Sequence, residues 1–161
     1  MSEQTEQQLL IEELGIGIQD LLNLSPLASR IYALLILCSY DGLTFEEIRT
    51  IIKASKSSIS ININVLTQLN YITYQTKPGD RKRYFKLARY SSIISLNAYH
   101  TAIEKEIKIV GEVNAFNETY HPEKFNNEES LGIIYQDYLK EKLQLVKKTA
   151  DKMTRFLENE K

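Results

Sequence analysis

The sequence predicts a mainly α fold with a small β-hairpin, and the order of elements between residues 44 and 87 carries this prediction. Two helix start signals follow each other closely, and two β-type segments joined by a Gly-containing basic turn come next. The resulting order of helix, turn, helix, strand, turn and strand is that of a winged helix-turn-helix, which few other folds share. Apolar periodicity on both sides of this segment adds long terminal helices.

Two helices are expected before this segment. Apolar residues at helical spacing predict a helix that ends near residue 22 and has two glycines in its middle. Ser25 and Pro26 then form an N-cap followed by a proline at the first helical position, where the absent N–H is not needed. Because the helix from Pro26 is apolar around most of its circumference, we expect it to be central in the core and to end near Ser39.

The next two helices form the helix-turn-helix. Thr44 and Glu47 have the spacing of a capping box, so a third helix is expected to run from there to about Lys53. Ser55 is a second N-cap, which opens a helix over residues 56–69. On a helical wheel one side of this helix is apolar and is expected to face the core. That side consists of Ile59, Ile63, Leu66 and Leu69, with Asn62 beside them.

A β-hairpin is expected after the fourth helix. Residues 71–76 and 83–87 are rich in β-branched and aromatic side chains, which favour strands. The turn-forming sequence Pro78-Gly79-Asp80 lies between them. The hairpin therefore carries a charged tip and forms the wing.

Two long helices are expected in the last part of the chain. Helical periodicity returns after Tyr90 and is interrupted by Pro122 and the polar pair Asn126-Asn127. The last helix, from about Glu128, carries more apolar surface than a lone terminal helix can leave in water. We therefore expect a homodimer in which a second copy covers the terminal helices. The alternative is that these helices fold back on their own winged domain.

The chain is accordingly divided into three parts: an N-terminal helix that serves as a dimerisation arm (1–24), a winged helix-turn-helix domain (25–89) and a C-terminal helical dimerisation region (90–161). The central part has ten Lys/Arg and four Asp/Glu, whereas the first part has none and five, and the last part ten and twelve. A basic centre between acidic ends places positive potential where a phosphate backbone would use it. Chance clustering of charge is the alternative.

The composition is that of an ordinary globular protein, with 161 residues, 43% apolar and 25% charged. The single cysteine, Cys38, has no intrachain partner, and no secretory leader pattern begins the sequence, so a cytoplasmic location is expected. The longest apolar run, residues 31–38, is far shorter than the roughly 20 residues that a membrane helix needs. We therefore expect no membrane association.

The side of helix 56–69 that faces away from the core is expected to read base edges in the major groove of DNA. Its residues are Ser57, Ser60, Ile61, Asn64 and Gln68. Asn64 and Gln68 suit pairing with adenine, although an ordinary polar side facing solvent is the alternative. Ile61 suits a thymine methyl group and a contact with a neighbouring element equally well.

Cations before and within the hairpin are expected to contact the DNA backbone and minor groove. These residues are Lys53, Lys56, Lys77, Arg81, Lys82 and Arg83. Arg81 suits the minor groove, whereas the two lysines before the hairpin and the two cations after Arg81 suit phosphates. Because phosphate would repel Asp80, we expect this residue to hold a nearby arginine or to cap the turn. A solvated charge run on an edge hairpin is the alternative.

Other chemistry is not indicated. The sequence has no phosphate-binding loop, zinc-protease motif or visible pairing of nucleophile and base, so we expect no enzyme activity, no cofactor and no metal. His100 and His121 lack neighbours with metal-ligand spacing. Cys38 is interpreted as a small core residue rather than a redox switch. Tyrosines at helical spacing in the last two helices suit packing better than an effector cavity.

The segment from Thr44 to Leu87 resembles the MarR-like winged-helix repressors, and within them the GbsR-type branch. The resemblance is carried by the SKSSIS start of the fourth helix, its NVLTQL continuation and the KPGDRKRYF hairpin. It implies a homodimer with interlocked terminal helices, two recognition helices on a palindromic operator and, in many members, a small-molecule effector. No residue here matches a ligand contact, so the effector is left unassigned.

These observations predict a dimeric, sequence-specific transcriptional regulator that binds double-stranded DNA and acts as a repressor by occupying a promoter. The leading alternative is a winged-helix module that docks on another protein and has no specific affinity for DNA.

Overall fold

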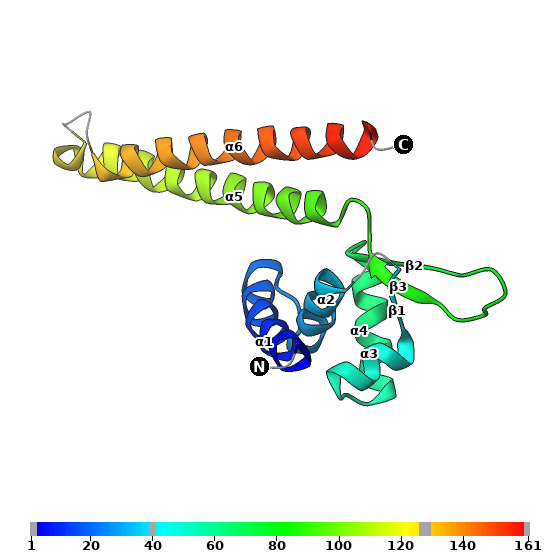
Figure 1. Ribbon diagram of the computed structural model, residues 1–161. Coiled ribbons are helices and arrows are strands. Elements are labelled where there is room, and N and C mark those ends of the chain that lie inside the picture. Colours follow the sequence, from blue (N-terminus) through cyan, green and yellow to red (C-terminus); the bar gives the residue numbers. More distant parts are fainter. Residues whose placement is uncertain (1–2, 39–40, 126–129, 160–161) are drawn as a thin grey trace. The chain divides into compact units, whose positions relative to one another are not determined.

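The computed structural model describes residues 3–38, 41–125 and 130–159 (Figure 1). The chain forms two compact units, residues 1–92 and residues 93–161. The first unit combines four helices with a small antiparallel sheet, and the second is a pair of long helices. The expected fold class, mainly α with a small β-hairpin, is confirmed.

The first unit begins with α1 (Glu3–Leu22) and α2 (Pro26–Leu37). The N-cap at Ser25 is confirmed, because its hydroxyl accepts the Ala28 N–H at 3.1 Å. α1 packs against α2, with Ile11 fully buried and Gly15 close to the backbone of Arg30. α2 ends at Leu37, and the expected end at Ser39 lies outside the described residues.

The helix-turn-helix consists of α3 (Phe45–Ile52) and α4 (Lys56–Gln68). In the capping box of α3 the Glu47 N–H donates to the Thr44 hydroxyl at 3.3 Å, and the Thr44 N–H donates to the Glu47 carboxylate at 2.7 Å. Lys53 takes a left-handed conformation with φ 56°, and Ser55 caps α4 by accepting the Ser58 N–H at 3.2 Å. The predicted boundaries of both helices are confirmed to within one or two residues.

The sheet has three antiparallel strands, β1 (Leu43–Thr44), β2 (Ile72–Gln75) and β3 (Tyr84–Leu87), in the order β1-β3-β2. The hairpin β2–β3 was predicted, whereas β1 was not, because two residues are too few to show a strand periodicity. β1 follows Gly42, whose φ is +75° and whose added Cβ would lie 2.6 Å from the Phe85 carbonyl oxygen. Glycine is therefore required for this close approach of β1 to β3.

α2 is the central element of this unit, as its apolar circumference predicted, and it contacts α1, α3, α4 and β3. The other buried side chains come from α3, α4 and the sheet. They include Ile48, Ile59, Ile63, Leu66, Ile72 and Phe85. The prediction for Leu69 was wrong, since its side chain is 45% exposed. Leu69 is the C-cap of α4, and the chain turns away at Asn70 with φ 59°, so this side chain lies at the end of the helix rather than within it.

One buried polar group has an effect on stability that can be measured. The Ser29 side chain in α2 is completely buried, and its hydroxyl oxygen has no hydrogen-bond partner among the described residues. Removing an unsatisfied buried hydroxyl removes a desolvation penalty, so Ser29→Ala is expected to raise the free energy of unfolding by about 1 kcal/mol in chemical denaturation.

The matched control for this change is Ser60→Ala, which makes the same replacement at an exposed position of α4. It reports the gain that comes from helix propensity alone, expected to be about 0.5 kcal/mol or less. A Ser29→Ala protein that is no more stable than the Ser60→Ala protein would show that the buried hydroxyl carries no penalty.

The second unit consists of α5 (Ser91–Tyr120), a short 3₁₀ helix (Pro122–Lys124) and α6 (Leu131–Asn159). The two long helices run antiparallel (Figure 1). Ile103, Leu139 and Val146 are buried between them, with further apolar side chains packed around. The predicted break after α5 is confirmed at Pro122, whereas its continuation at Asn126-Asn127 and the expected helix start at Glu128 lie outside the described residues.

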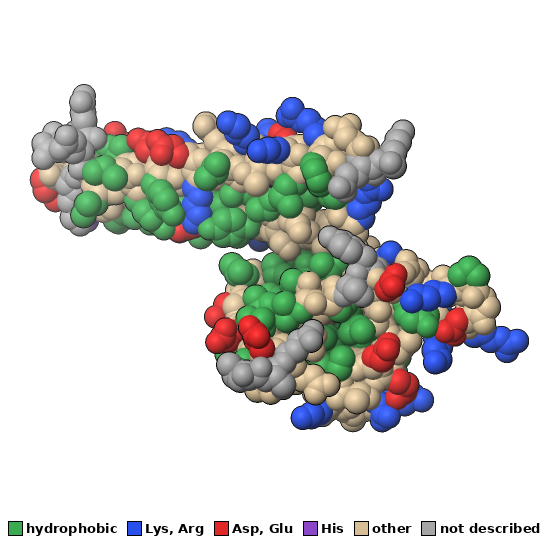
Figure 2. Space-filling model, in the orientation of Figure 1, with side chains coloured by type: hydrophobic (Ala, Val, Ile, Leu, Met, Phe, Trp, Pro, Cys, Tyr) green, Lys and Arg blue, Asp and Glu red, His purple; other side chains and the backbone are tan. Residues whose placement is uncertain are grey.

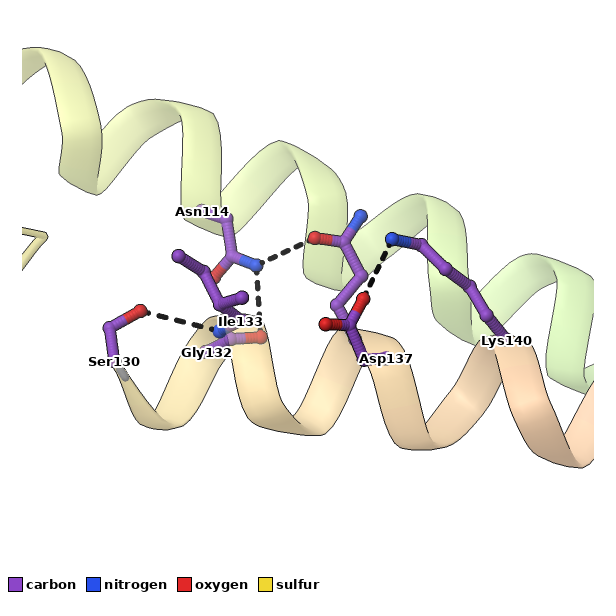
Figure 3. A network of polar contacts seen from close by, with 7 residues as sticks. Asn114, Ser130, Gly132, Ile133, Asp137 and Lys140 are labelled. Carbon is purple, nitrogen blue, oxygen red and sulfur yellow. Dashed lines mark hydrogen bonds and ion pairs between the residues drawn. The ribbon is translucent and has the colours of Figure 1, made fainter. Parts of the chain in front are cut away.

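A polar network ties α5 to α6 near the connection (Figure 3). The Asn114 side-chain amide donates to the Gly132 carbonyl and to the Gln136 side chain, both at 3.1 Å. An added Cβ at Gly132 would lie 2.3 Å from the Asn114 side-chain oxygen, so a larger residue at this position would displace the Asn114 amide. Ser130 opens α6 by accepting the Ile133 N–H at 3.3 Å. These contacts fix the register of the two helices.

Within the described residues, no single helix has both the length and the apolar composition to cross a membrane. Helices 4–22 and 26–37 satisfy those two criteria only when taken together, and the chain bends by 118° between them.

Candidate nucleic-acid interface

The outward side of α4 is the first component of the candidate interface. Five residues predicted to read bases are all exposed, and Ile61 is exposed by 62%. They are Ser57, Ser60, Ile61, Asn64 and Gln68. Asn62, which was expected beside the core, donates to the Ser58 carbonyl at 2.8 Å and accepts the Ser25 hydroxyl at 2.6 Å. It therefore fastens α4 to the start of α2 and keeps the outward side turned away from the core.

The turn before α4 carries two of the lysines that are predicted to contact DNA phosphates. Lys53 is the left-handed residue that ends α3, and Lys56 is the first residue of α4, and both are exposed. The Ser57 hydroxyl lies 3.1 Å from that of Ser55, so it takes part in the capping of α4. Two cations thus stand beside the N-terminus of α4, where its free N–H groups and helix dipole also favour an anion.

The wing tip is a tight turn closed by Asp80. The Asp80 N–H donates to the Lys77 carbonyl at 3.0 Å. Gly79 has φ 77°, as the third residue of a type II turn requires. The Asp80 carboxylate accepts the Lys82 N–H at 2.9 Å and the Tyr84 hydroxyl at 2.7 Å. Of the two roles expected for Asp80, turn capping is confirmed, and among the described residues it has no arginine partner.

The four wing cations fall into two pairs. The Lys77 ammonium lies 4.2 Å from the centre of the Tyr84 ring, and the Arg83 guanidinium lies 4.6 Å from the centre of the Tyr74 ring. Such cation–π contacts hold a charge against the protein's own surface. Arg81 and Lys82 are exposed, and their side chains form no ion pair or ring contact with the part of the chain that the structure describes.

α3, α4 and the hairpin enclose an open groove of about 520 Å³. Its lining has apolar side chains, Phe45, Ile63, Tyr74 and Phe85, and polar or charged ones, of which Glu46 is acidic. The other polar and charged lining residues include Ser60, Asn64, Arg81, Lys82 and Arg83. The structure therefore brings two predicted base readers and three wing cations to one groove, whereas Ser57, Ile61, Gln68, Lys53, Lys56 and Lys77 lie outside its lining. Lysine and arginine side chains gather over this hairpin (Figure 2).

The acidic residues near the groove are held by internal donors. Glu46 forms an ion pair with Arg49 at 2.9 Å. The Thr44 hydroxyl and N–H lower the pKa of Glu47, with a smaller effect from the charges of Lys82 and Lys77. The Lys82 N–H and then the Tyr84 hydroxyl lower the pKa of Asp80. Since these oxygens are already hydrogen-bonded or paired, the cations at the wing tip are the groups left to meet an anion.

Sequence reasoning missed Tyr74 and Tyr84 as parts of the interface. Both tyrosines were assigned only to strands. A signal was present, because Lys77 and Arg83 lie in the loop within two residues of the strands that carry the two tyrosines. The antiparallel register of β2 and β3, which pairs Tyr74 with Phe85 and Gln75 with Tyr84, was needed to see it.

Other candidate sites have weaker support. His100 and His121 each lie near one glutamate, at 3.5 Å and 3.7 Å, and the described residues contain no group of three potential metal ligands. Cys38 is half-buried, and burial raises the pKa of its thiol, which favours the unreactive protonated form.

The fold and the groove define a winged helix-turn-helix. Residues 29–88 match the family model described as a winged helix DNA-binding domain. The predicted winged helix-turn-helix domain is therefore confirmed, and the finer MarR-like and GbsR-type assignments stay predictions.

Two known proteins share parts of this architecture. The HTH-type transcriptional regulator MmpR5 of Mycobacterium tuberculosis (strain ATCC 25618 / H37Rv) is 34% identical over 77 residues, which are 48% of this chain and 46% of the relative. The match thus spans less than half the length of that protein. A crystal structure of a transcriptional regulator has a TM-score of 0.51 and 21% identity, and the similarity covers 94% of this chain and 95% of that one. This second likeness shows the fold alone.

Proposed function

We propose that this chain is a sequence-specific, double-stranded DNA-binding transcriptional regulator that acts as a homodimeric repressor. The observation that supports it is the shared groove, which Ser60 and Asn64 from the outward side of α4 line together with Arg81 and Lys82 of the wing tip. A recognition helix in the major groove with a basic wing beside it is the docking arrangement for such a geometry. MmpR5, which is 34% identical over the matched part, is named as an HTH-type transcriptional regulator.

Base reading is assigned to the outward side of α4. Asn64 and Gln68 present amides that suit the paired acceptor and donor of adenine. Ser57 and Ser60 are short and let the helix approach the base edges closely. Ile61, which is exposed on this side, is assigned to a thymine methyl group.

Backbone contacts are assigned to the cations. Lys53 and Lys56 clamp phosphates beside the N-terminus of α4, and Arg81 enters the minor groove with Lys82 next to it. Lys77 and Arg83 were expected to contact DNA in the same way. Because each lies on a tyrosine ring, we now assign them a smaller share of the phosphate contacts.

The dimer is assigned mainly to an outer face of the α5–α6 pair. Besides the side that faces its neighbour, each helix has a second stripe in which residues recur at alternating intervals of three and four, the heptad spacing of helix bundles. On α5 this stripe is Tyr99, Ala102, Glu106, Ile109, Val113, Phe116 and Tyr120. On α6 it is Leu131, Tyr135, Tyr138, Lys142, Leu145, Thr149, Lys152 and Phe156. Most of these side chains are exposed.

The two stripes form one continuous face. The Tyr135 hydroxyl on α6 donates to the Glu106 carboxylate on α5, and this bond raises the pKa of Tyr135. The Lys142 ammonium lies 5.0 Å from the Tyr99 ring centre and 5.4 Å from that of Tyr138. Apolar and tyrosine side chains line one side of the helix pair (Figure 2). A second copy offers the same heptad stripes, together with the charges of Glu106 and Lys142. A two-fold four-helix bundle would therefore cover this face.

The proposed organisation keeps three functional parts: residues 1–24 as a dimerisation arm, 25–89 as the DNA-binding domain and 90–161 as the main dimerisation region. α1 packs on α2 of its own chain, yet Leu9, Ile16 and Leu21 remain exposed on it for a second copy. A small-molecule effector belongs to the proposal through the family resemblance alone.

Selection from a randomised duplex pool, followed by binding measurements, tests this function. The selected duplex is expected to bind at least about 1,000-fold more tightly than a scrambled duplex, and its affinity should fall steeply with salt because phosphate contacts release counterions. The alternative, a winged-helix module that docks on a protein, predicts no enriched sequence and equal affinity for both duplexes.

A further inference from the structure

We propose that Tyr84 is a positioning residue of the wing: its hydroxyl, bonded to the Asp80 carboxylate, holds the tip so that Arg81 and Lys82 are already in place when DNA binds. This inference rests on the proposed DNA-binding function and names a residue that makes that binding efficient. Tyr84 itself is not assigned a DNA contact.

The geometry closes the tip at several points. Asp80 uses both carboxylate oxygens, one for the Lys82 N–H at 2.9 Å and the other for the Tyr84 hydroxyl at 2.7 Å. Its own N–H closes the preceding turn on Lys77. Arg81 therefore lies inside a loop whose two ends are joined through one carboxylate.

The far end of this closure is anchored in the sheet. Tyr84 begins the central strand β3, where it pairs with Gln75 on β2 and with Thr44 on β1. Thr44 is also the N-cap of α3. The bond from Tyr84 to Asp80 thus fixes the position of the tip relative to the sheet and to the helix-turn-helix. The base readers project from this helix-turn-helix.

Closure of the tip in the free protein matters because a flexible tip would have to become ordered when DNA binds. A flexible loop loses backbone and side-chain freedom when its cations settle on phosphates, and this loss reduces affinity. Each dimer would carry two wings, so the effect of one substitution on the free energy of DNA binding is doubled. We expect loss of the hydroxyl to weaken binding of the selected duplex about 10-fold.

Tyr84→Phe is the test, because it removes the hydroxyl and keeps the ring on which the Lys77 ammonium lies. Tyr90→Phe is the matched control: it makes the same replacement at an exposed tyrosine that does not line the groove. The affinity of the Tyr84→Phe protein for the selected duplex is expected to fall about 10-fold, and that of the Tyr90→Phe protein less than about 2-fold. Equal affinity of the two variants would overturn the inference.

A double-mutant cycle with Arg81→Ala distinguishes positioning from a general structural role. If Tyr84 acts through the tip cations, Tyr84→Phe should cost less than about 2-fold once Arg81 is absent, and the single variant should show a shallower salt dependence. Fully additive effects would contradict the inference and leave the proposed function standing. A wild-type protein that binds no duplex preferentially would overturn both.

Discussion

Replacing Arg81 and Lys82 together by alanine is expected to weaken binding of the selected duplex by at least about 100-fold at physiological salt, the largest effect on DNA binding that we expect from the wing. The two side chains are exposed and unpaired within the described part of the chain, so their charges are available to phosphate. A dimer with two wings would lose four cations. The slope of log K against log salt should therefore become shallower by about 3 to 4.

The control for this variant removes the same charge elsewhere. Lys147 and Lys148 are adjacent, exposed residues of α6 that belong to neither the inner nor the outer stripe of the helix. Their double replacement by alanine is expected to change affinity by less than about 2-fold, because these lysines are assigned no DNA contact and exposed charges without one are screened at this salt concentration. Fluorescence anisotropy on one labelled duplex compares the three proteins, and equal losses in both double variants would mean that only the net charge matters.

Val113→Glu is expected to raise the dissociation constant of the dimer by at least about 100-fold. Val113 is 52% exposed in the outer stripe of α5, where the second copy is proposed to pack. A carboxylate there would lose its hydration on association, a penalty of several kcal/mol for the pair of copies. Analytical ultracentrifugation over a range of protein concentrations measures the change.

Ala115→Glu is the matched control for the dimer. Ala115 is exposed on the same helix, two residues further on and so about 200° around it, away from the stripe. This variant carries the same added charge and is expected to associate like the wild type. A Val113→Glu protein that associates like both of them would mean that the outer face does not form the dimer.

Helix ends were the part of the fold that the sequence determined best. Thr44, Ser55 and Ser25 each combine a hydroxyl with the spacing that a cap requires, so the first helices could be placed from local chemistry alone. The two-residue strand β1 and the exposure of Leu69 could not be placed in this way. Both depend on where the chain turns in three dimensions, at Gly42 and at Asn70.

The candidate site was predicted in its outline and not in its internal contacts. The helical wheel separated the inward from the outward residues of α4 because the period of a helix is fixed. The division of the wing cations was not predictable, since it depends on the strand register that brings Arg83 to Tyr74. In α6 the inner and outer stripes overlap in sequence, so residues such as Leu139 and Tyr138 were counted as one surface until the helix pair showed which side is buried.

The central claim is that the outward side of α4 reads bases, and selection from a randomised duplex pool with the wild type and with Asn64→Ala tests it most directly. The wild type is expected to recover a palindrome with half-sites about 10 base pairs apart. The variant should recover the same palindrome with the preference lost at one position in each half-site. An unchanged preference in the Asn64→Ala protein, or no enriched sequence with the wild type, would contradict the claim.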